Sequence, residues 1–250
     1  MRHRTPAICL RTTDYSETSQ VVHFFTRDQG KVGLIAKGSK RPKSKSGGAL
    51  DLLSEGDLVY SESRSGGLGT LIEFDETVWR TPLRQCPRSL HAALYMIELV
   101  GAMLGENDPH PEIYDLLKNA LARLGEPDAP TAAVLAYFQW RLLLRAGLLG
   151  EMGRCVSCGR EMTPPIKEAY FSSDQGGLLC GACEPSAVEK YRLDPQALVG
   201  LTTMRSAQGP RRGKLQLPEP QARAVGRLLN YHVTHQLRRP LRTARWAIGE

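Results

Sequence analysis

The stretch SQVVHFFTRDQGKVGLIAKG, residues 19–38, decides how the first third of this chain folds. Two apolar segments rich in Val, Phe and Ile flank the short polar sequence RDQGK, a pattern that is typical of two strands joined by a turn. Gly30 suits the positive φ that a tight hairpin requires. The stretch therefore predicts a β-hairpin.

Three further segments of the same kind surround the hairpin. They are TPAICLR (residues 5–11), DLVYSES (57–63) and GTLIEFDE (69–76). Five short strands with the longest connection between the third and the fourth fit a small Greek-key barrel of the OB type, which we expect over residues 1–82. An SH3-like barrel fits the same pattern, so the two folds remain alternatives.

From Arg88 onward the apolar residues recur at spacings of three and four, which is typical of amphipathic helices, and Gly- and Pro-rich interruptions mark the helix ends. The helices are expected over residues 88–104, 111–125, 129–150, 186–205 and 218–239. We therefore expect a multi-domain α+β protein. Residues 86–152 and 185–250 form one helical domain in this interpretation, and residues 153–184 form a small insertion.

The insertion contains four cysteines in two close pairs, Cys155 with Cys158 and Cys180 with Cys183. Four thiolates at this spacing can hold a tetrahedral zinc ion, and Gly159 and Gly181 allow the tight turns that direct the sulfurs. We predict one structural zinc per chain, which folds an element too small to fold alone. Disulfides, a redox role and an iron–sulfur cluster are the weaker alternatives.

The remaining cysteines and histidines give no comparable pattern. Cys9 lies in a predicted strand and Cys86 at a domain junction, so we expect neither to be a ligand. His110, followed by Glu112, resembles the start of a zinc-deaminase motif, but Arg154 replaces the Pro expected before the first cysteine. No phosphate-binding or hydrolase motif is found in the sequence, so we expect no enzymatic activity.

The charge of the chain is uneven. The formal net charge is +7, and residues 205–250 carry ten Lys and Arg against two Asp and Glu. Residues 86–204 are acidic, with ten cations against fourteen acids. Basic ends around an acidic middle indicate sites for a polyanion, although a solvated basic face is the alternative for the C-terminal end.

The densest group of cations is KGSKRPKSK, residues 37–45, directly after the third predicted strand. We expect this basic loop to track the phosphates of single-stranded nucleic acid, with hydrogen bonds added by serine hydroxyls. The cations are Lys37, Lys40, Arg41, Lys43 and Lys45, and the serines are Ser39, Ser44 and Ser46. Of the adjacent Phe24 and Phe25, one must face away from the barrel core. We expect the helical domain to cover it, and stacking on a base is the alternative.

A C-terminal basic helix is the second expected nucleic-acid site. Its central residues are Arg238, Arg239 and Arg242, and Arg223, Arg227 and Arg245 extend the same path. The N-terminus has no apolar leader, and no apolar run approaches the roughly 18 residues of a membrane span. We expect a cytoplasmic protein without membrane contact.

At this point the sequence resembles a known family. DYSETSQVVHFFTRDQGKVGLIAKGSKRPKSK, residues 14–45, is similar to the N-terminal signature of the bacterial RecO proteins. The matching features are Asp-Tyr-x-Glu before the second strand, Thr-x-x-x-Gly-Lys at the hairpin and Ala-Lys-Gly at the start of the basic loop. The order of barrel, helices, four cysteines and basic final helix is also similar.

The resemblance implies a recombination mediator in DNA repair. Such a protein binds single- and double-stranded DNA, anneals complementary strands, partners RecR and helps RecA displace single-strand-binding protein, in association with the nucleoid. The alternative from a different class is a zinc-containing protein–protein adaptor whose basic ends dock acidic partners.

Single-strand-binding proteins end in an acidic tail with an aromatic tip, so a receptor needs an apolar pocket with cations at its rim. Arg123 ends the second predicted helix, and Arg141 and Arg145 lie on one face of the third, beside leucines. We expect these three arginines to bind the tail. Neutralisation of the helix C-terminus or of local acids is the alternative.

Overall fold

The computed structural model describes residues 1–41, 44, 48–63, 66–78, 80–150, 152–162, 166, 168–206 and 217–249. The chain forms two compact units, Met1–Pro127 and Asp128–Glu250. The first unit holds the strands β1–β5 and the helices α1–α3, and the second holds α4, the cysteine-containing element and the helices α5–α7. Segments 86–152 and 185–250, predicted to form one helical domain, thus contribute helices to both units.

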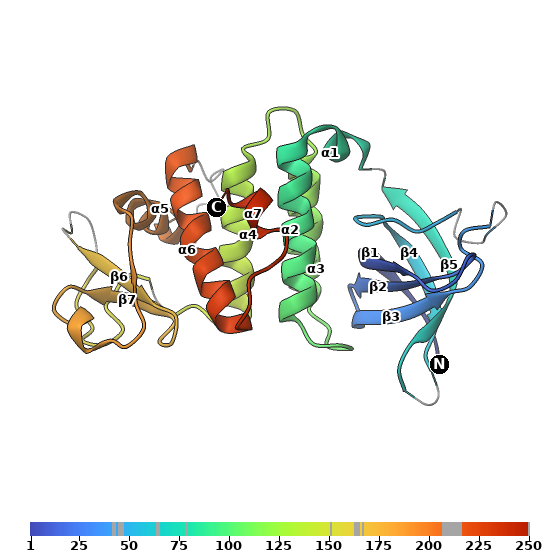
Figure 1. Cartoon of the computed structure of the whole chain (residues 1–250), viewed down its shortest axis with the longest axis horizontal. Helices are drawn as coiled ribbons and strands as arrows, with labels where there is room; N and C mark the ends of the chain where they lie inside the picture. Colours follow the sequence, from blue (N-terminus) through green and yellow to red (C-terminus); the bar gives the residue numbers. More distant parts are fainter. Residues whose placement is uncertain are drawn as a thin grey trace. The chain divides into compact units, whose positions relative to one another are not determined.

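The five predicted strands are confirmed, and they form one sheet (Figure 1). Their bounds are β1 Arg2–Asp14, β2 Gln20–Thr26, β3 Gly30–Ala36, β4 Glu55–Ser61 and β5 Gly69–Val78. The strand order is β1-β2-β3-β5-β4, and β1 also pairs antiparallel with β4, so the hydrogen-bonded order closes on itself. β3 and β5 are parallel, and the other neighbours are antiparallel.

The inner face of this sheet encloses an apolar core. Its strand members alternate along the strands, as the sequence pattern requires: Ala7, Cys9, Val22, Phe24, Val32, Leu34, Ala36, Leu58, Tyr60 and Phe74. Leu50, from the connection between β3 and β4, completes the core. Burial raises the pKa of the Cys9 thiol far above its ordinary value. Cys9 is therefore a core residue, in agreement with the prediction.

The turn between β2 and β3 has the conformation that the sequence predicts. Gly30 has a φ of +69°. A Cβ atom at this position would lie 2.2 Å from the carbonyl oxygen of Asp108, in the loop that follows α2. Thr26 closes the turn, because its hydroxyl donates to the carbonyl of Gly30 at 2.9 Å. Glycine is thus required here by φ and by space.

The two adjacent phenylalanines of β2 face opposite sides of the sheet. Phe24 packs in the core against Phe74, with ring centroids 5.1 Å apart. Phe25 points outward and packs against Tyr114 of α3, with centroids 5.9 Å apart. Both phenylalanines are fully buried. The expectation that helices cover the second ring is confirmed.

The helices of the first unit are α1 Thr81–Gln85, α2 Pro87–Met103 and α3 Pro111–Leu124. α2 and α3 match the predicted segments closely, and each begins with proline, whose missing N–H costs nothing in the first turn. A buried ion pair between Glu55 and Arg80 joins β4 to the segment before α1, and Lys118 of α3 also contacts Glu55, at 3.2 Å. The side chain of Arg80 is only 6% exposed.

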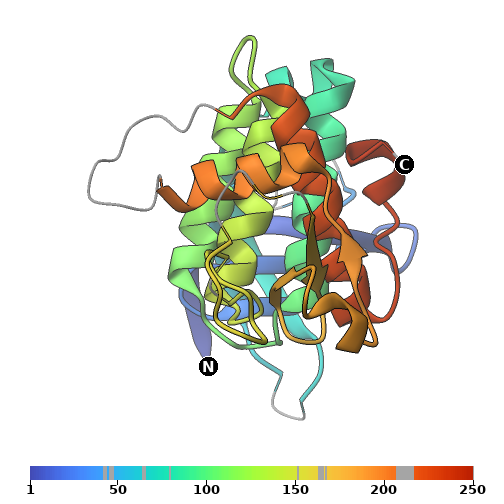
Figure 2. The ribbon, with the colours of Figure 1, turned by 90° about the vertical axis from the view of Figure 1, so that its left-hand side faces the viewer.

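The helices of the second unit are α4 Thr131–Arg145, α5 Pro195–Ser206, α6 Glu219–Leu237 and α7 Ala244–Ala247. α6 packs against both α4 and α5 (Figure 2). Gly200 permits the close approach of α5, since a Cβ there would lie 2.7 Å from Cγ2 of Val225 on α6.

A small three-stranded sheet accompanies these helices, in the order β7-β6-β8. Its strands are β6 Ala169–Ser172, β7 Gly177–Cys180 and β8 Tyr191–Arg192, and the short 3-10 helix η1 spans Glu184–Ser186. The predicted helix over residues 186–205 is therefore wrong in its first half. The helix begins only at Pro195, where the carboxylate of Asp194 accepts the N–H of Gln196 at 2.8 Å.

In the part of the chain that the structure describes, no helix combines the length and the apolar character needed to cross a bilayer.

Candidate metal centre and nucleic-acid interface

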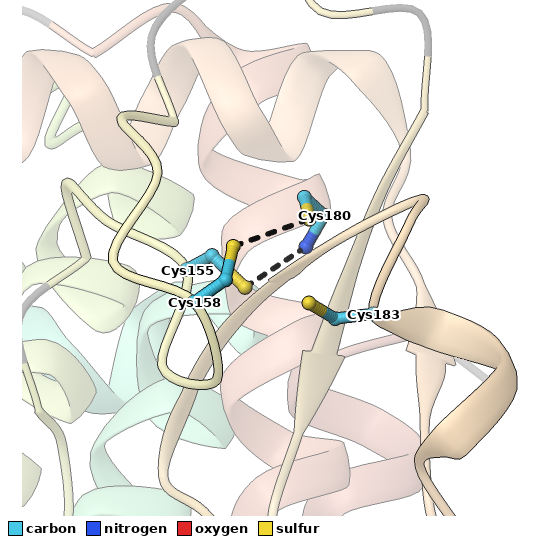
Figure 3. A group of neighbouring side chains, drawn as sticks. All are labelled: Cys155, Cys158, Cys180 and Cys183. Atoms are coloured by element: carbon cyan, nitrogen blue, oxygen red, sulfur yellow. Dashed lines mark hydrogen bonds between the residues drawn. The ribbon is translucent and has the colours of Figure 1, made fainter.

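The four predicted ligands come together in the second unit (Figure 3). Cys155 and Cys158 lie on one loop, Cys180 ends β7, and Cys183 follows in the next turn. All four Sγ atoms lie within 4.8 Å of one another. The sequence spacing therefore places four sulfur atoms around one point.

Local backbone geometry turns the first cysteine pair inward. The N–H of Gly159 donates to the carbonyl of Cys155 at 2.8 Å, and Gly159 has a φ of +73°. In the second pair, the N–H of Cys183 donates to the carbonyl of Cys180 at 3.0 Å. Gly181 has no positive φ, so the expectation that its conformational freedom makes this turn is corrected: the turn closes in an ordinary conformation.

The surroundings favour a negative charge on the sulfur of Cys155 and oppose one on the sulfur of Cys183. The backbone N–H of Cys180 donates to Sγ of Cys155 at 3.4 Å. Burial raises the pKa of the Cys155 thiol, but hydrogen bonds from the backbone of Cys180 and Cys158 outweigh it and lower that pKa to about 6. The nearby sulfurs of Cys158 and Cys180 raise the pKa of Cys183 to about 12. Four thiolates therefore need a cation between them.

One sulfur–sulfur distance matches the edge of a tetrahedral metal site. Sγ of Cys158 lies 3.8 Å from Sγ of Cys180. A tetrahedron with metal–sulfur distances of about 2.3 Å, as for zinc, has edges of about 3.8 Å. A disulfide needs about 2.05 Å between the sulfurs, far less than is observed. The four-cysteine cluster is thus compatible with a metal site.

A second group of metal-type side chains, Asp174, Glu189 and His235, lies near this element. Its hydrogen bonds explain it without an ion. The Glu189 carboxylate accepts the N–H groups of Ser173 at 2.5 Å and of Asp174 at 3.2 Å, and it also accepts the hydroxyl of Tyr231 on α6. His235 of α6 pairs with Asp174 at 2.8 Å. These contacts hold the β6–β7 turn against α6.

The basic loop begins on an ordered turn. Lys37 and Arg41 are exposed, and Nζ of Lys40 forms an ion pair with Asp14 at 2.7 Å. Lys43, Lys45 and Ser46 lie outside the described residues.

Ser39 was expected to donate a hydrogen bond to a phosphate, and the structure corrects this expectation. It is 2% exposed, and its hydroxyl donates to Oε1 of Gln20 at 3.0 Å. The hydroxyl of Ser44 accepts the N–H of Gly48 at 2.9 Å. These two hydroxyls thus hold the connection in place, Ser39 through the side chain of Gln20 and Ser44 through the backbone of Gly48.

Gln20 is a residue whose role the sequence interpretation missed. Besides Ser39, it binds the other end of the loop: its Oε1 accepts the N–H of Leu50 at 2.9 Å, and its Nε2 donates to the carbonyl of Leu50 at 3.2 Å. One buried amide therefore closes the base of the basic loop. A polar residue in the first, inward position of a strand is the signal that identifies it.

The C-terminal arginines do not share one helix, which corrects the expectation of a single basic helix. α6 ends at Leu237, and Arg238 follows it with a φ of +54°. Arg238, Arg239 and Arg242 are exposed beyond the helix.

Arg223, Arg227 and Arg245 have local partners. Arg223 pairs with Glu219 at 2.6 Å, and Arg227 pairs with Asp194 at 3.4 Å. The guanidinium of Arg245 lies 4.1 Å from the ring centroid of Trp246.

The arginines expected to bind an acidic tail lie in different units. Arg123, near the end of α3 in the first unit, forms an ion pair with Glu126. Arg141 and Arg145 lie on α4 in the second unit, and the guanidinium of Arg141 lies 5.9 Å from the ring centroid of Tyr137. Their role in binding a tail stays a prediction.

The resemblance to a deaminase motif has no support in the geometry. His110 pairs with Asp108 at 3.0 Å and with Glu112 at 3.7 Å, in the first unit, whereas the four-cysteine cluster lies in the second. Cys86 is exposed before α2 and lies outside the four-cysteine cluster.

Comparison with known proteins covers both units. Residues 1–76 match the family model described as "Recombination protein O N terminal", and residues 84–245 match "Recombination protein O C terminal". A relative from Myxococcus xanthus, named DNA repair protein RecO, is 31% identical over 245 residues, which cover 97% of this chain and 95% of the relative.

Two other relatives carry the same name. The one from Rhodopirellula baltica is 34% identical over 183 residues, and the one from Salinibacter ruber is 36% identical over 151 residues. These alignments cover 72% and 60% of this chain, and 66% and 58% of the respective relatives.

Proposed function

Because the chain belongs to the RecO family of bacterial DNA repair proteins, we propose that it acts as a recombination mediator that binds DNA without catalysing a reaction. In this role it binds single- and double-stranded DNA and anneals complementary strands. With RecR as partner, it helps to load RecA onto DNA coated by single-strand-binding protein. Its place of action is the cytoplasm, at the nucleoid.

The first support is the fold of the strand region. A closed order of five strands, with one parallel pair between β3 and β5, agrees with a Greek-key barrel of the OB type. This class of barrel commonly binds single-stranded nucleic acid, through a charged groove and its connecting loops. The basic loop lies between β3 and β4, in the longest connection of the sheet.

The observation that carries the proposal is the exposed pair Lys37 and Arg41, on a turn that Gln20 and Ser39 hold in place. Exposed cations on an ordered turn bind phosphates and release the counterions around DNA. Lys40 can join them, because its ion pair with Asp14 lies at the surface, where such a pair contributes only about 0–1 kcal/mol, and a phosphate can replace the carboxylate.

The salt dependence of DNA binding tests the proposal. We expect the double variant Lys37→Ala/Arg41→Ala to bind all sequences more weakly, with a slope of log K against log salt smaller by about 1.4 units on single strands and about 1.8 on duplex. The control is Arg27→Ala, which removes an exposed arginine that already pairs with Asp115 at 3.3 Å. If the slope stayed unchanged in the double variant, Lys37 and Arg41 would not contact the DNA, and the basic loop would not be part of the DNA site.

The same titration separates the mediator from the adaptor. A protein–protein adaptor has no steep salt dependence on naked DNA, whereas a phosphate-binding mediator does. Annealing of two complementary oligonucleotides, followed by fluorescence, then tests the function itself. We expect the wild type to accelerate annealing and the double variant not to.

For the four-cysteine cluster we propose one structural zinc ion per chain. Cys155, Cys158, Cys180 and Cys183 would hold it, and the ion would neutralise their thiolates. The support is the distance between the sulfurs of Cys158 and Cys180, which matches a tetrahedron edge, and the N–H group directed at Cys155. All four positions of a tetrahedral ion are then filled by protein, which leaves no site for catalysis.

A further inference from the structure

Tyr15 is the most exposed aromatic residue in the described part of the chain, at 65% relative exposure. Most large apolar side chains of the first unit are buried, Phe24, Phe25 and Tyr114 among them. A single exposed apolar side chain is common on a protein surface, so Tyr15 indicates a binding role only together with the residues around it.

The turn that carries Tyr15 connects β1 to β2 and is closed by its own backbone. The N–H of Tyr15 donates to the carbonyl of Ser19 at 3.0 Å, and Ser16 and Ser19 exchange hydrogen bonds at 3.2 Å and 3.4 Å. The ring is thus presented on a fixed backbone. Little conformational entropy is lost when a ligand stacks on it.

This turn is joined directly to the start of the basic loop. The N–H of Gly38 donates to the hydroxyl of Ser19 at 3.2 Å, and the N–H of Lys40 donates to the carbonyl of Thr18 at 3.2 Å. Asp14, the neighbour of Tyr15 in sequence, forms the ion pair with Lys40. An exposed aromatic ring and several cations are therefore held together at one end of the sheet.

We propose that Tyr15 is a stacking platform for one base of single-stranded DNA whose phosphates lie on Lys37, Lys40 and Arg41. This inference rests on the proposed DNA-binding function and gives it a means of selecting single strands. Any DNA offers phosphates to the cations, but only an unpaired strand has bases free to stack on a side chain. Stacking on an aromatic ring tolerates every base, since each has a π face.

The test compares Tyr15→Ala with the wild type on a single-stranded oligothymidylate and on a duplex of equal length. We expect the variant to lose roughly tenfold in affinity for the single strand and less than about twofold for the duplex. Its salt slope should stay that of the wild type, since no phosphate contact is lost. Tyr15→Phe should restore the affinity, because the ring and not the hydroxyl stacks.

Two further measurements complete the design. Val188→Ala, which shortens an exposed apolar side chain of the second unit, is the control and should bind both DNAs as the wild type does. In Tyr15→Trp, oligothymidylate should quench the fluorescence of the new indole. Equal losses on both DNAs, no loss at all, or no rescue by Tyr15→Phe would overturn the proposal. If the wild type itself failed to bind either DNA, the proposed function would fail first.

Discussion

Nζ of Lys31 on β3 donates to the backbone carbonyl of Gly101 on α2 at 2.8 Å. The same amine lies 3.3 Å from the carboxylate of Glu106, and the backbone carbonyl of Lys31 accepts the N–H of Asn107 at 2.9 Å. Its side chain is only 11% exposed. Although Lys31 lies six residues before the basic loop, it joins the sheet to a helix and is not available to DNA.

Replacement of Lys31 should therefore affect stability and not DNA binding. We expect Lys31→Met to lower the free energy of unfolding by about 2 kcal/mol, because the carbonyl of Gly101 and the carboxylate of Glu106 lose their cation. Lys37→Met is the control, since it removes an exposed lysine. It should leave stability nearly unchanged and reduce the salt slope of DNA binding. Urea unfolding and DNA titration of both variants measure the contrast, and a reversed pattern would refute the assignment of the two lysines.

Gly30 is the second position where the structure makes a sharp prediction. Gly30→Ala places a methyl group against the carbonyl of Asp108 and forces alanine into a positive φ. We expect a loss of at least about 2 kcal/mol in the free energy of unfolding. Gly66→Ala is the control, because Gly66 has a φ of +79° but nothing within 4 Å of the added Cβ. Gly66→Ala should lower the free energy of unfolding by about 1 kcal/mol, which is the cost of the positive φ alone. Equal costs would show that the loop at Asp108 gives way.

The strands and the long helices were predictable because each carries a clear period. Period-two alternation over β1–β5 and spacings of three and four over α2, α3, α4 and α6 are set by burial of one face. The short strands β6 and β7 were not predicted, since four residues cannot establish a period. The apolar spacing before Pro195 also predicts a helix, but the start signal Asp194-Pro195 marks where the helix begins.

The candidate sites were predictable to different degrees. The four cysteines were identified from spacing alone, because a metal site needs few ligands at fixed separations. The role of Ser39 cannot be identified from the sequence, since only the fold shows that its hydroxyl binds Gln20. Arg223, Arg227 and Arg245 likewise look alike in the sequence, and only the structure shows that they contact Glu219, Asp194 and Trp246 respectively.

Metal content is the third prediction. We expect one zinc per chain in freshly purified protein, and removal by a chelator should unfold the β6–β7–β8 sheet, because folding of such an element depends on the ion. Cys155→Ser and Cys180→Ser should lose the zinc and several kcal/mol of stability. Cys86→Ser changes an exposed cysteine outside the four-cysteine cluster, and this variant should keep the zinc and the stability of the wild type. Metal analysis together with thermal unfolding checks this, and purified wild type without zinc would contradict it.

The contacts of the C-terminal arginines predict unequal contributions to DNA binding. Arg238 and Arg239 are exposed beyond α6, whereas Arg223 and Arg227 already pair with carboxylates. We expect Arg238→Ala/Arg239→Ala to reduce the salt slope on duplex DNA by up to about 1.8 units, and Arg223→Ala/Arg227→Ala by much less. Titrations at several salt concentrations compare the two double variants. Equal slopes, both as in the wild type, would show that the C-terminal region is a solvated face.

The last prediction concerns the tail of single-strand-binding protein, a proposed partner. Arg141 and the ring of Tyr137 lie one helical turn apart on α4, and Tyr137 is 36% exposed. A cation next to an exposed aromatic ring suits a peptide with an aromatic tip and carboxylates, since one residue stacks and the other pairs. We expect Arg141→Glu to weaken binding of a labelled tail peptide at least about tenfold, or about 1.4 kcal/mol, while affinity for naked DNA stays unchanged. Arg192→Glu makes the same charge change beside Glu168 and should bind the peptide as the wild type does. If both variants lost affinity equally, overall charge and not a site on α4 would attract the tail.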